Sequence, residues 1–176
     1  MPSTGSAGGP ALERLWAGWR NAYVTDVAQQ ELAARKDECI FCAIAASPDA
    51  RDQVIARGEH VFALLNAFPY TSGHLMVAPL RHEGNLENLH DDETSELMQM
   101  MVAATRAVKE AYAPDGVNIG INLGRAAGAG IPTHLHVHVL PRWHADTNFM
   151  TTVAEARVMP EALSVTLERL KSAWPS

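Results

Sequence analysis

A strict alternation of histidine and aliphatic residues runs through residues 134–140, which read His-Leu-His-Val-His-Val-Leu. In an extended strand successive side chains point to opposite faces. The pattern therefore predicts a strand with His134, His136 and His138 on one face and aliphatic side chains in the core on the other. Neighbouring imidazoles would be about 6.5–7 Å apart along such a strand.

Three histidines in register have three uses that the residues alone leave open. They could share a catalytic metal, as three-His zinc sites do. They could be ordinary core or surface histidines. One could be a nucleophile whose neighbours control its tautomer and its phosphate partner. A small-residue loop at residues 124–130 precedes the strand and offers backbone N–H groups to an anion.

Three further segments read as strands. Residues 61–66 and 74–79 flank a turn rich in proline and glycine, which predicts a hairpin. Residues 116–123 alternate between apolar side chains on one face and Asn118, Gly120 and Asn122 on the other.

Two helices are predicted. The first begins after a cap at Asp91 or Asp92, carries apolar residues at helical spacing and ends before Pro114. The second starts near Pro160 and has leucines on one face. Strands grouped around one long helix, with antiparallel hairpins, favour an α+β fold over a doubly wound parallel sheet.

The length of 176 residues predicts one domain. Residues 1–14 are small and glycine-rich and are expected to form a loose tail, with the single domain at 15–176. The tryptophans and tyrosine of residues 15–24 are expected to dock on the body or on a second subunit.

The charge balance of 14 Lys and Arg against 20 Asp and Glu gives −6 and a pI near 5.7. This argues against nucleic acid and anionic membranes as partners. Only two cysteines occur, Cys39 and Cys42, so no extracellular disulfide framework is expected. Without a basic, apolar leader or a membrane-length apolar run, the chain is expected to be cytoplasmic.

The chain resembles the histidine-triad nucleotide-binding family over residues 15–149. Residues 15–20, 141–143 and 146–149 look like the bacterial diadenosine tetraphosphate phosphorylase branch. Besides the histidine-bearing strand, the matching motifs are Cys39-Ile40-Phe41-Cys42, Asn66, Gly73-His74 running to Pro79 and His82, and Asn122 with its glycine loop. The resemblance implies a HIT-like antiparallel sheet, with one long helix and a C-terminal helix, that extends across a homodimer.

The resemblance also implies roles for individual residues. His136 would attack the α-phosphorus and form a nucleotidyl-histidine, His138 would contact phosphate and assist the leaving group, and His74 would lie behind them. Asn66 would bind ribose hydroxyls, while Asn122 and the backbone at Gly130 would hold phosphate. From the residues themselves, Trp143 could stack on a base or pack on the surface. Arg142 and Arg125 are candidate phosphate contacts or solvated arginines.

A structural zinc is implied in family members with paired cysteines, and its ligands map to Cys39, Cys42, His82 and His134. Two other interpretations of the cysteines stay open: small buried residues or a redox pair. Mg²⁺ could accompany the substrate. No organic cofactor is expected.

The implied reaction is phosphorolysis of diadenosine tetraphosphate to ATP and ADP, with inorganic phosphate as the acceptor. Water as acceptor would make a hydrolase of dinucleoside polyphosphates, and nucleoside phosphoramidates are a further substrate class. A nucleotide-binding regulatory protein with weak catalysis is the rival from another class. Many family members carry Gln and Ser or Thr where this chain has Gly130-Ile131, so its leaving-group preference is left open.

Overall fold

The computed structural model describes residues 39–47, 52–144, 146 and 161–175. The expected tail at residues 1–14, the aromatic segment at 15–24 and Pro160 lie outside the described residues. The elements in chain order are α2 (Ile40–Ala46), β1 (Val54–Arg57), β2 (Val61–Leu65), β3 (Leu75–Pro79), η4 (Leu86–Asn88), α3 (Asp91–Tyr112), β4 (Gly116–Ile121), η5 (Arg125–Ala127), β5 (Val137–Arg142) and α5 (Leu163–Ser172).

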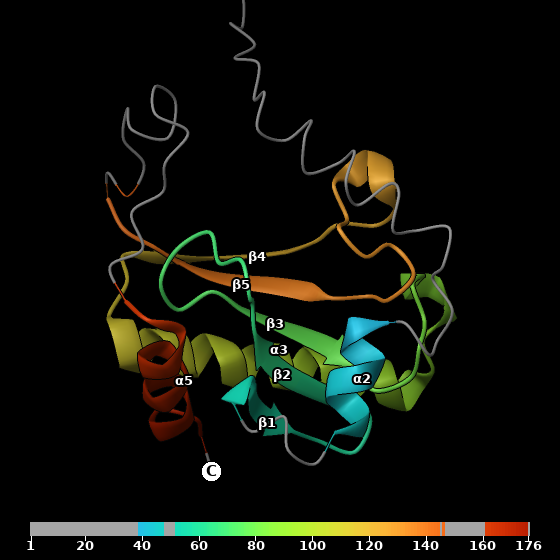
Figure 1. The fold of residues 1–176 in the computed structure, drawn as a ribbon, viewed down its shortest axis with the longest axis horizontal. Coiled ribbons are helices and arrows are strands. Elements are labelled where there is room, and N and C mark those ends of the chain that lie inside the picture. Colours follow the sequence, from blue (N-terminus) through green and yellow to red (C-terminus); the bar gives the residue numbers. More distant parts are fainter. Residues whose placement is uncertain (1–38, 48–51, 145, 147–160, 176) are drawn as a thin grey trace, which may run out of the picture.

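The strands form a five-stranded antiparallel sheet in the order β1-β2-β3-β5-β4 (Figure 1). The predicted hairpin is confirmed, with Val61 opposite Pro79 and Leu65 opposite Leu75. The α+β class is confirmed as well. The short elements α2 and β1 were not expected from the sequence.

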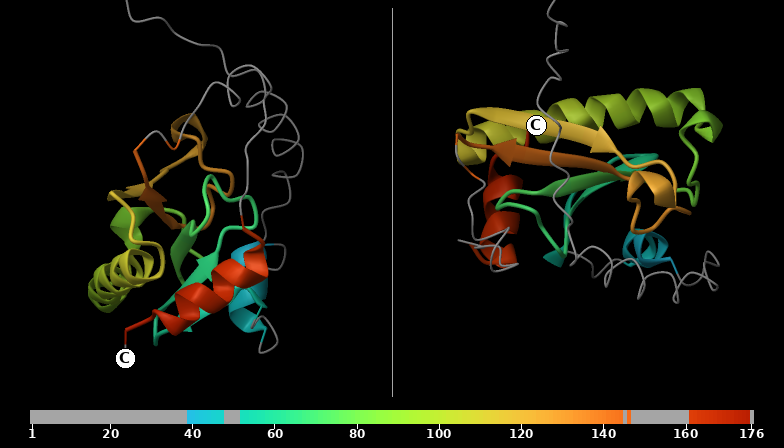
Figure 2. Two further views of the ribbon diagram at one scale, coloured as in Figure 1. Left: turned by 90° about the vertical axis from the view of Figure 1, so that its left-hand side faces the viewer. Right: turned by 90° about the horizontal axis from the view of Figure 1, so that it is seen from above.

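Helices cover both faces of the sheet, with α3 on one side and α2 on the other (Figure 2). The two faces of β2 and β3 consequently belong to two cores. Their odd-numbered residues pack in the cluster that includes α3 and α5, and their even-numbered residues pack against α2. Because both faces are buried, these strands read as continuous apolar runs instead of alternating ones.

The long helix α3 confirms the prediction, except at its cap. His90 is the N-cap residue, and its N–H donates to Glu93 Oε2 at 2.8 Å. Asp91 and Asp92, expected as caps, lie instead in the first turn, where acidic side chains interact favourably with the helix dipole. The helix ends at Tyr112, and its C-cap residue Ala113 has a left-handed conformation directly before Pro114.

The histidine-bearing segment differs from the prediction at its start. Regular pairing in β5 begins at Val137, so His134 and His136 lie on the approach to the strand. Pairing with β3 stops there because β3 ends at Pro79, which has no N–H to continue the ladder. Leu135 N–H donates instead to the carbonyl of Glu83 at 2.6 Å. None of the helices described is both long enough and apolar enough to cross a membrane.

Candidate functional site

The three histidines are buried where the start of β5 meets β3 and α2. Leu135, Val137 and Val139 lie in the core beneath α3, as the alternation predicted. His136 and His138 have ring centroids 5.1 Å apart in an edge-to-face arrangement. They are closer than the spacing of alternate residues along a regular strand.

His136 is held in one tautomer by the backbone. Its Nδ1 lies 2.8 Å from the carbonyl oxygen of His134. A carbonyl can only accept, so Nδ1 carries the hydrogen and a neutral ring keeps its lone pair on Nε2. Burial lowers the pKa of His136, which favours this neutral form. Phe41 of α2 stacks on the ring at 5.0 Å.

His74 and His138 form a second, directed hydrogen bond. Tyr70 N–H donates to His74 Nδ1 at 3.0 Å, so the neutral His74 ring carries its hydrogen on Nε2. That Nε2 lies 3.0 Å from His138 Nδ1, which therefore accepts. The hydrogen of a neutral His138 is then on Nε2. Burial lowers the pKa of His138 to about 4 and so supports the neutral ring.

Four side chains predicted as zinc ligands converge beside the triad. Cys39 at the start of α2, Cys42 in its first turn, His82 after β3 and His134 before β5 have ligand atoms within 4.8 Å of one another. Cys39 Sγ and Cys42 Sγ lie 3.3 and 3.6 Å from His134 Nδ1, and Cys42 Sγ lies 3.3 Å from His82 Nδ1. Ligand atoms around tetrahedral zinc are about 3.3–3.8 Å apart, and these three distances fall in that range, so the two cysteines and two histidines suit a structural site.

The orientation of His134 also suits a metal ligand. Its Nε2 donates to the carbonyl of Pro79 at 2.8 Å, which leaves Nδ1 free of hydrogen and directed at the sulfurs. His136 and His138 are outside this cluster, and their Nδ1 atoms are engaged by the carbonyl of His134 and by His74. Within the described chain the geometry therefore does not favour one metal shared by all three histidines.

Of the predicted ribose and phosphate contacts, Asn66 lies beside His74 and Asn122 lies against the glycine loop. Asn66, at the end of β2, accepts from Phe68 N–H at 2.9 Å and has its Nδ2 3.3 Å from His74 Nδ1. Asn122, at the end of β4, donates to the carbonyl of Gly128 at 3.4 Å and so ties the strand to the loop that contains Gly130. This loop is mostly exposed, and its backbone turns at Gly128 with φ of 93°.

The structure places Arg142 and Trp143 against protein partners. Arg142, at the end of β5, makes a bidentate pair with Asp146 at 2.6 and 2.7 Å and donates to Asn118 Oδ1 at 2.9 Å. The Trp143 ring meets Tyr112 of α3 edge-on at 6.3 Å. The contacts of these two residues do not place either of them against the imidazole rings of His136 and His138.

Arg125, the other candidate phosphate contact, lies exposed on η5.

Two aromatic neighbours of the site were not identified from the sequence. Phe41 lies between the two cysteines and contacts His134 and His136. Tyr70 lies in the hairpin turn and contacts His74 and His138. Their positions in the Cys39–Cys42 motif and just before His74 are local signals, but ring stacking depends on contacts that the sequence does not show.

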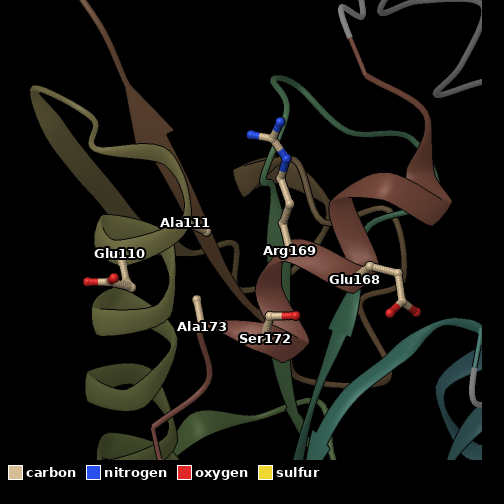
Figure 3. Close-up of a pocket in the computed structure, with 6 residues that line it drawn as sticks. All are labelled: Glu110, Ala111, Glu168, Arg169, Ser172 and Ala173. Carbon is tan, nitrogen blue, oxygen red and sulfur yellow. The ribbon is translucent and has the colours of Figure 1, made fainter.

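A surface groove between α3 and α5 is a separate feature (Figure 3). Its charged side chains, Glu110, Glu168 and Arg169, point in different directions, and Arg169 Nε is paired with Glu161 at 2.9 Å. The groove contains none of the predicted site residues. It therefore does not offer a set of groups that converge on a ligand.

Comparisons with known proteins agree with this geometry. Residues 47–145 match the model of the HIT domain. An AP-4-A phosphorylase from Mycobacterium tuberculosis is 40% identical over 165 residues, 93% of this chain and 85% of that protein. A Zn-bound histidine triad family protein from Mycobacterium smegmatis superimposes with a TM-score of 0.64 at 27% identity, covering 79% of this chain and 94% of the other.

A hypothetical histidine triad nucleotide-binding protein from Sulfolobus tokodaii gives a TM-score of 0.62 at 26% identity, covering 77% of this chain and 91% of the other. The similarity thus includes the sheet and the histidine-bearing segment.

Proposed function

Because this chain belongs to the HIT family, we propose that it transfers a nucleotidyl group from diadenosine tetraphosphate through a histidine-AMP intermediate. One observation carries this proposal. His136 Nδ1 is fixed at 2.8 Å from a backbone carbonyl, which leaves the Nε2 lone pair of a neutral ring for attack. The relative named AP-4-A phosphorylase, similar over most of both chains, supports the choice of substrate.

The first step forms the intermediate. Nε2 of His136 attacks the α-phosphorus of one adenylyl group, an N–P bond forms, and the bond from that phosphorus to the bridging oxygen breaks. ATP leaves. The Nε2–H of His138 donates a hydrogen bond to the leaving oxygen, as its directed contact with His74 allows.

The second step regenerates the enzyme. An oxygen of hydrogen phosphate attacks the same phosphorus, the N–P bond breaks, and its electron pair returns to Nε2 of His136. ADP leaves, and the proton of hydrogen phosphate passes to solvent. Water in the same position would give AMP, so the acceptor distinguishes a phosphorylase from a hydrolase.

The substrate would lie across the residues around the histidines. Asn66 is assigned to the ribose, and Asn122 with the backbone at Gly130 to phosphate. Arg142 and Trp143 already have protein partners, and the mechanism needs neither of them.

Zinc would be held by Cys39, Cys42, His82 and His134, where it would join α2 to the sheet. Its role would be structural, since the four protein ligands complete a tetrahedral shell. Among the described residues no second cluster of three or more such side chains is close enough to share a metal. This gives no support to a separate magnesium site in this part of the chain.

A homodimer would extend the sheet through β4. In the part of the chain that the structure describes, this strand is at the edge of the sheet, and Ile119 and Leu123 beside that edge are about half exposed. An unpaired strand edge with apolar side chains is a template for another chain. Light scattering on the purified protein gives its mass directly.

Product analysis tests the proposed reaction. The protein is incubated with diadenosine tetraphosphate, with and without inorganic phosphate, and the nucleotides are separated by chromatography. ATP and ADP that form only with phosphate are expected. ATP and AMP in both samples would identify a hydrolase. Binding without any turnover would favour a regulatory protein.

A further inference from the structure

Tyr70 contacts the His74–His138 pair through both its backbone and its ring. It lies in the turn between β2 and β3, four residues before His74. The turn is closed by the N–H of His74, which donates to the carbonyl of Thr71 at 3.2 Å, and by Gly73 with φ of 79°. Tyr70 N–H then reaches back to His74 Nδ1 at 3.0 Å.

The backbone contact gives the pair its direction. An amide N–H can only donate, so it sets His74 Nδ1 as acceptor and places the hydrogen on Nε2. His138 Nδ1 must accept that hydrogen at 3.0 Å and keeps its own on Nε2. The Tyr70 amide is thus the first donor in a chain of two hydrogen bonds, from Tyr70 to His74 and from His74 to His138. This chain leaves Nε2–H of His138 as the group that can donate to substrate.

The ring of Tyr70 covers the same pair. Its ring centroid lies 4.8 Å from that of His74 and 5.9 Å from that of His138, with an interplanar angle of 29° to the His138 ring. His74 and His138 are 1% and 9% exposed, whereas Tyr70 is 49% exposed. One side of the phenol ring is therefore toward the imidazoles and another toward solvent. The ring is thus in contact with both partners of this hydrogen bond.

We propose that Tyr70 is a positioning residue, which keeps His138 as a neutral Nε2–H donor by directing His74 and by covering the His74–His138 hydrogen bond. This inference deepens the proposed function and rests on it. Water that reached the pair could replace either partner and let His138 rotate or change tautomer. A displaced donor would weaken leaving-group stabilisation more than substrate binding.

Substitutions of Tyr70 test the role of its ring while the backbone N–H is kept. Tyr70→Leu removes the ring and keeps the N–H, and Tyr70→Phe keeps both. The matched control is Phe68→Leu, since Phe68 lies in the same turn and is 77% exposed. Tyr70→Met repeats the test if the leucine variant does not fold.

The expected kinetic result is a fall in kcat without a matching rise in KM. With diadenosine tetraphosphate and phosphate, Tyr70→Leu should lower kcat about 10-fold and change KM less than about threefold. Tyr70→Phe and Phe68→Leu should stay within about twofold of the wild type in both. A wild-type kcat for Tyr70→Leu would overturn the inference.

Proton NMR of the imidazole N–H groups gives a readout that needs no turnover. The downfield Nε2–H signal of His74, which donates to His138 Nδ1, should be sharp in the wild type and in Tyr70→Phe, and should broaden through exchange with water in Tyr70→Leu. A sharp signal in Tyr70→Leu contradicts the inference, even if kcat falls. Full activity of His136→Ala would instead reject the proposed function, whatever Tyr70 does.

Discussion

The carbonyl oxygen of His134 lies 2.8 Å from Nδ1 of His136. The side chain of His134 meanwhile directs its own Nδ1 at Cys39 Sγ, 3.3 Å away. One residue thus joins the cysteine-containing cluster to the imidazole proposed as nucleophile. Whatever holds the His134 backbone in place also holds the tautomer of His136, so the cysteine-containing cluster and the proposed nucleophile are mechanically connected.

Replacement of His136 by alanine should abolish nucleotidyl transfer. No other group can form the N–P bond in the proposed mechanism, so kcat should fall at least about 10³-fold. His138→Ala, which removes only a donor, should cost about 10²–10⁴-fold. Turnover and a rapid-quench search for the AMP adduct by mass spectrometry measure both effects. An adduct that persists in His136→Ala would place the nucleophile elsewhere.

Replacement of Cys39 by serine should lower zinc content and stability more than it changes the chemical step. A weaker ligand set would destabilise the fold by on the order of 3 kcal/mol. Metal analysis and thermal unfolding measure this, and a chelator should lower the melting temperature of the wild type more than that of the variant. Unchanged zinc stoichiometry in Cys39→Ser would exclude the four-ligand site.

Replacement of Glu93 by glutamine should cost stability in a pH-dependent way. The buried Glu93 carboxylate accepts two hydrogen bonds from Arg81, at 2.7 and 2.8 Å, and these hold its pKa down at about 2. The stabilisation is fully present above the ordinary value of 4.5 and is lost as the pH falls from there toward 2.

Urea unfolding should therefore show Glu93→Gln about 1–3 kcal/mol less stable than the wild type at pH 6. The difference should shrink at pH 3.5. Glu110→Gln, in an exposed position on the same helix, is the control. A difference that is constant between the two pH values would show that the carboxylate charge is not its source.

Replacement of Gly73 by alanine should destabilise the turn before His74. Gly73 has φ of 79°, and a Cβ there would lie 2.8 Å from Cε2 of Tyr112. A loss of about 1–3 kcal/mol in the free energy of unfolding is expected. Gly120→Ala, where a Cβ would meet nothing within 4 Å, should stay within about 0.5 kcal/mol of the wild type. Equal effects of the two substitutions would reject this account.

The local periodicities of the sequence determined much of the fold. Alternation with period two predicted β4 and the aliphatic face of the histidine segment, and helical spacing between acidic residues and Pro114 predicted α3. These patterns are readable because each depends only on neighbours along the chain. The Cys39–Cys42 spacing by itself left several uses of the two cysteines open, and only the family resemblance implied that they are zinc ligands.

The tertiary structure decided which distant residues meet. Cys39 and His134 are 95 residues apart, yet their ligand atoms lie 3.3 Å from each other because α2 packs on the sheet beside the start of β5. The stacking of Phe41 on His136 is likewise visible only in the tertiary structure. Its contacts also show that Arg142 pairs with Asp146 and that the Trp143 ring contacts the Tyr112 ring. The physical reason is that side-chain partners follow from how helices and strands pack, whereas periodicity records only which side of each element is apolar.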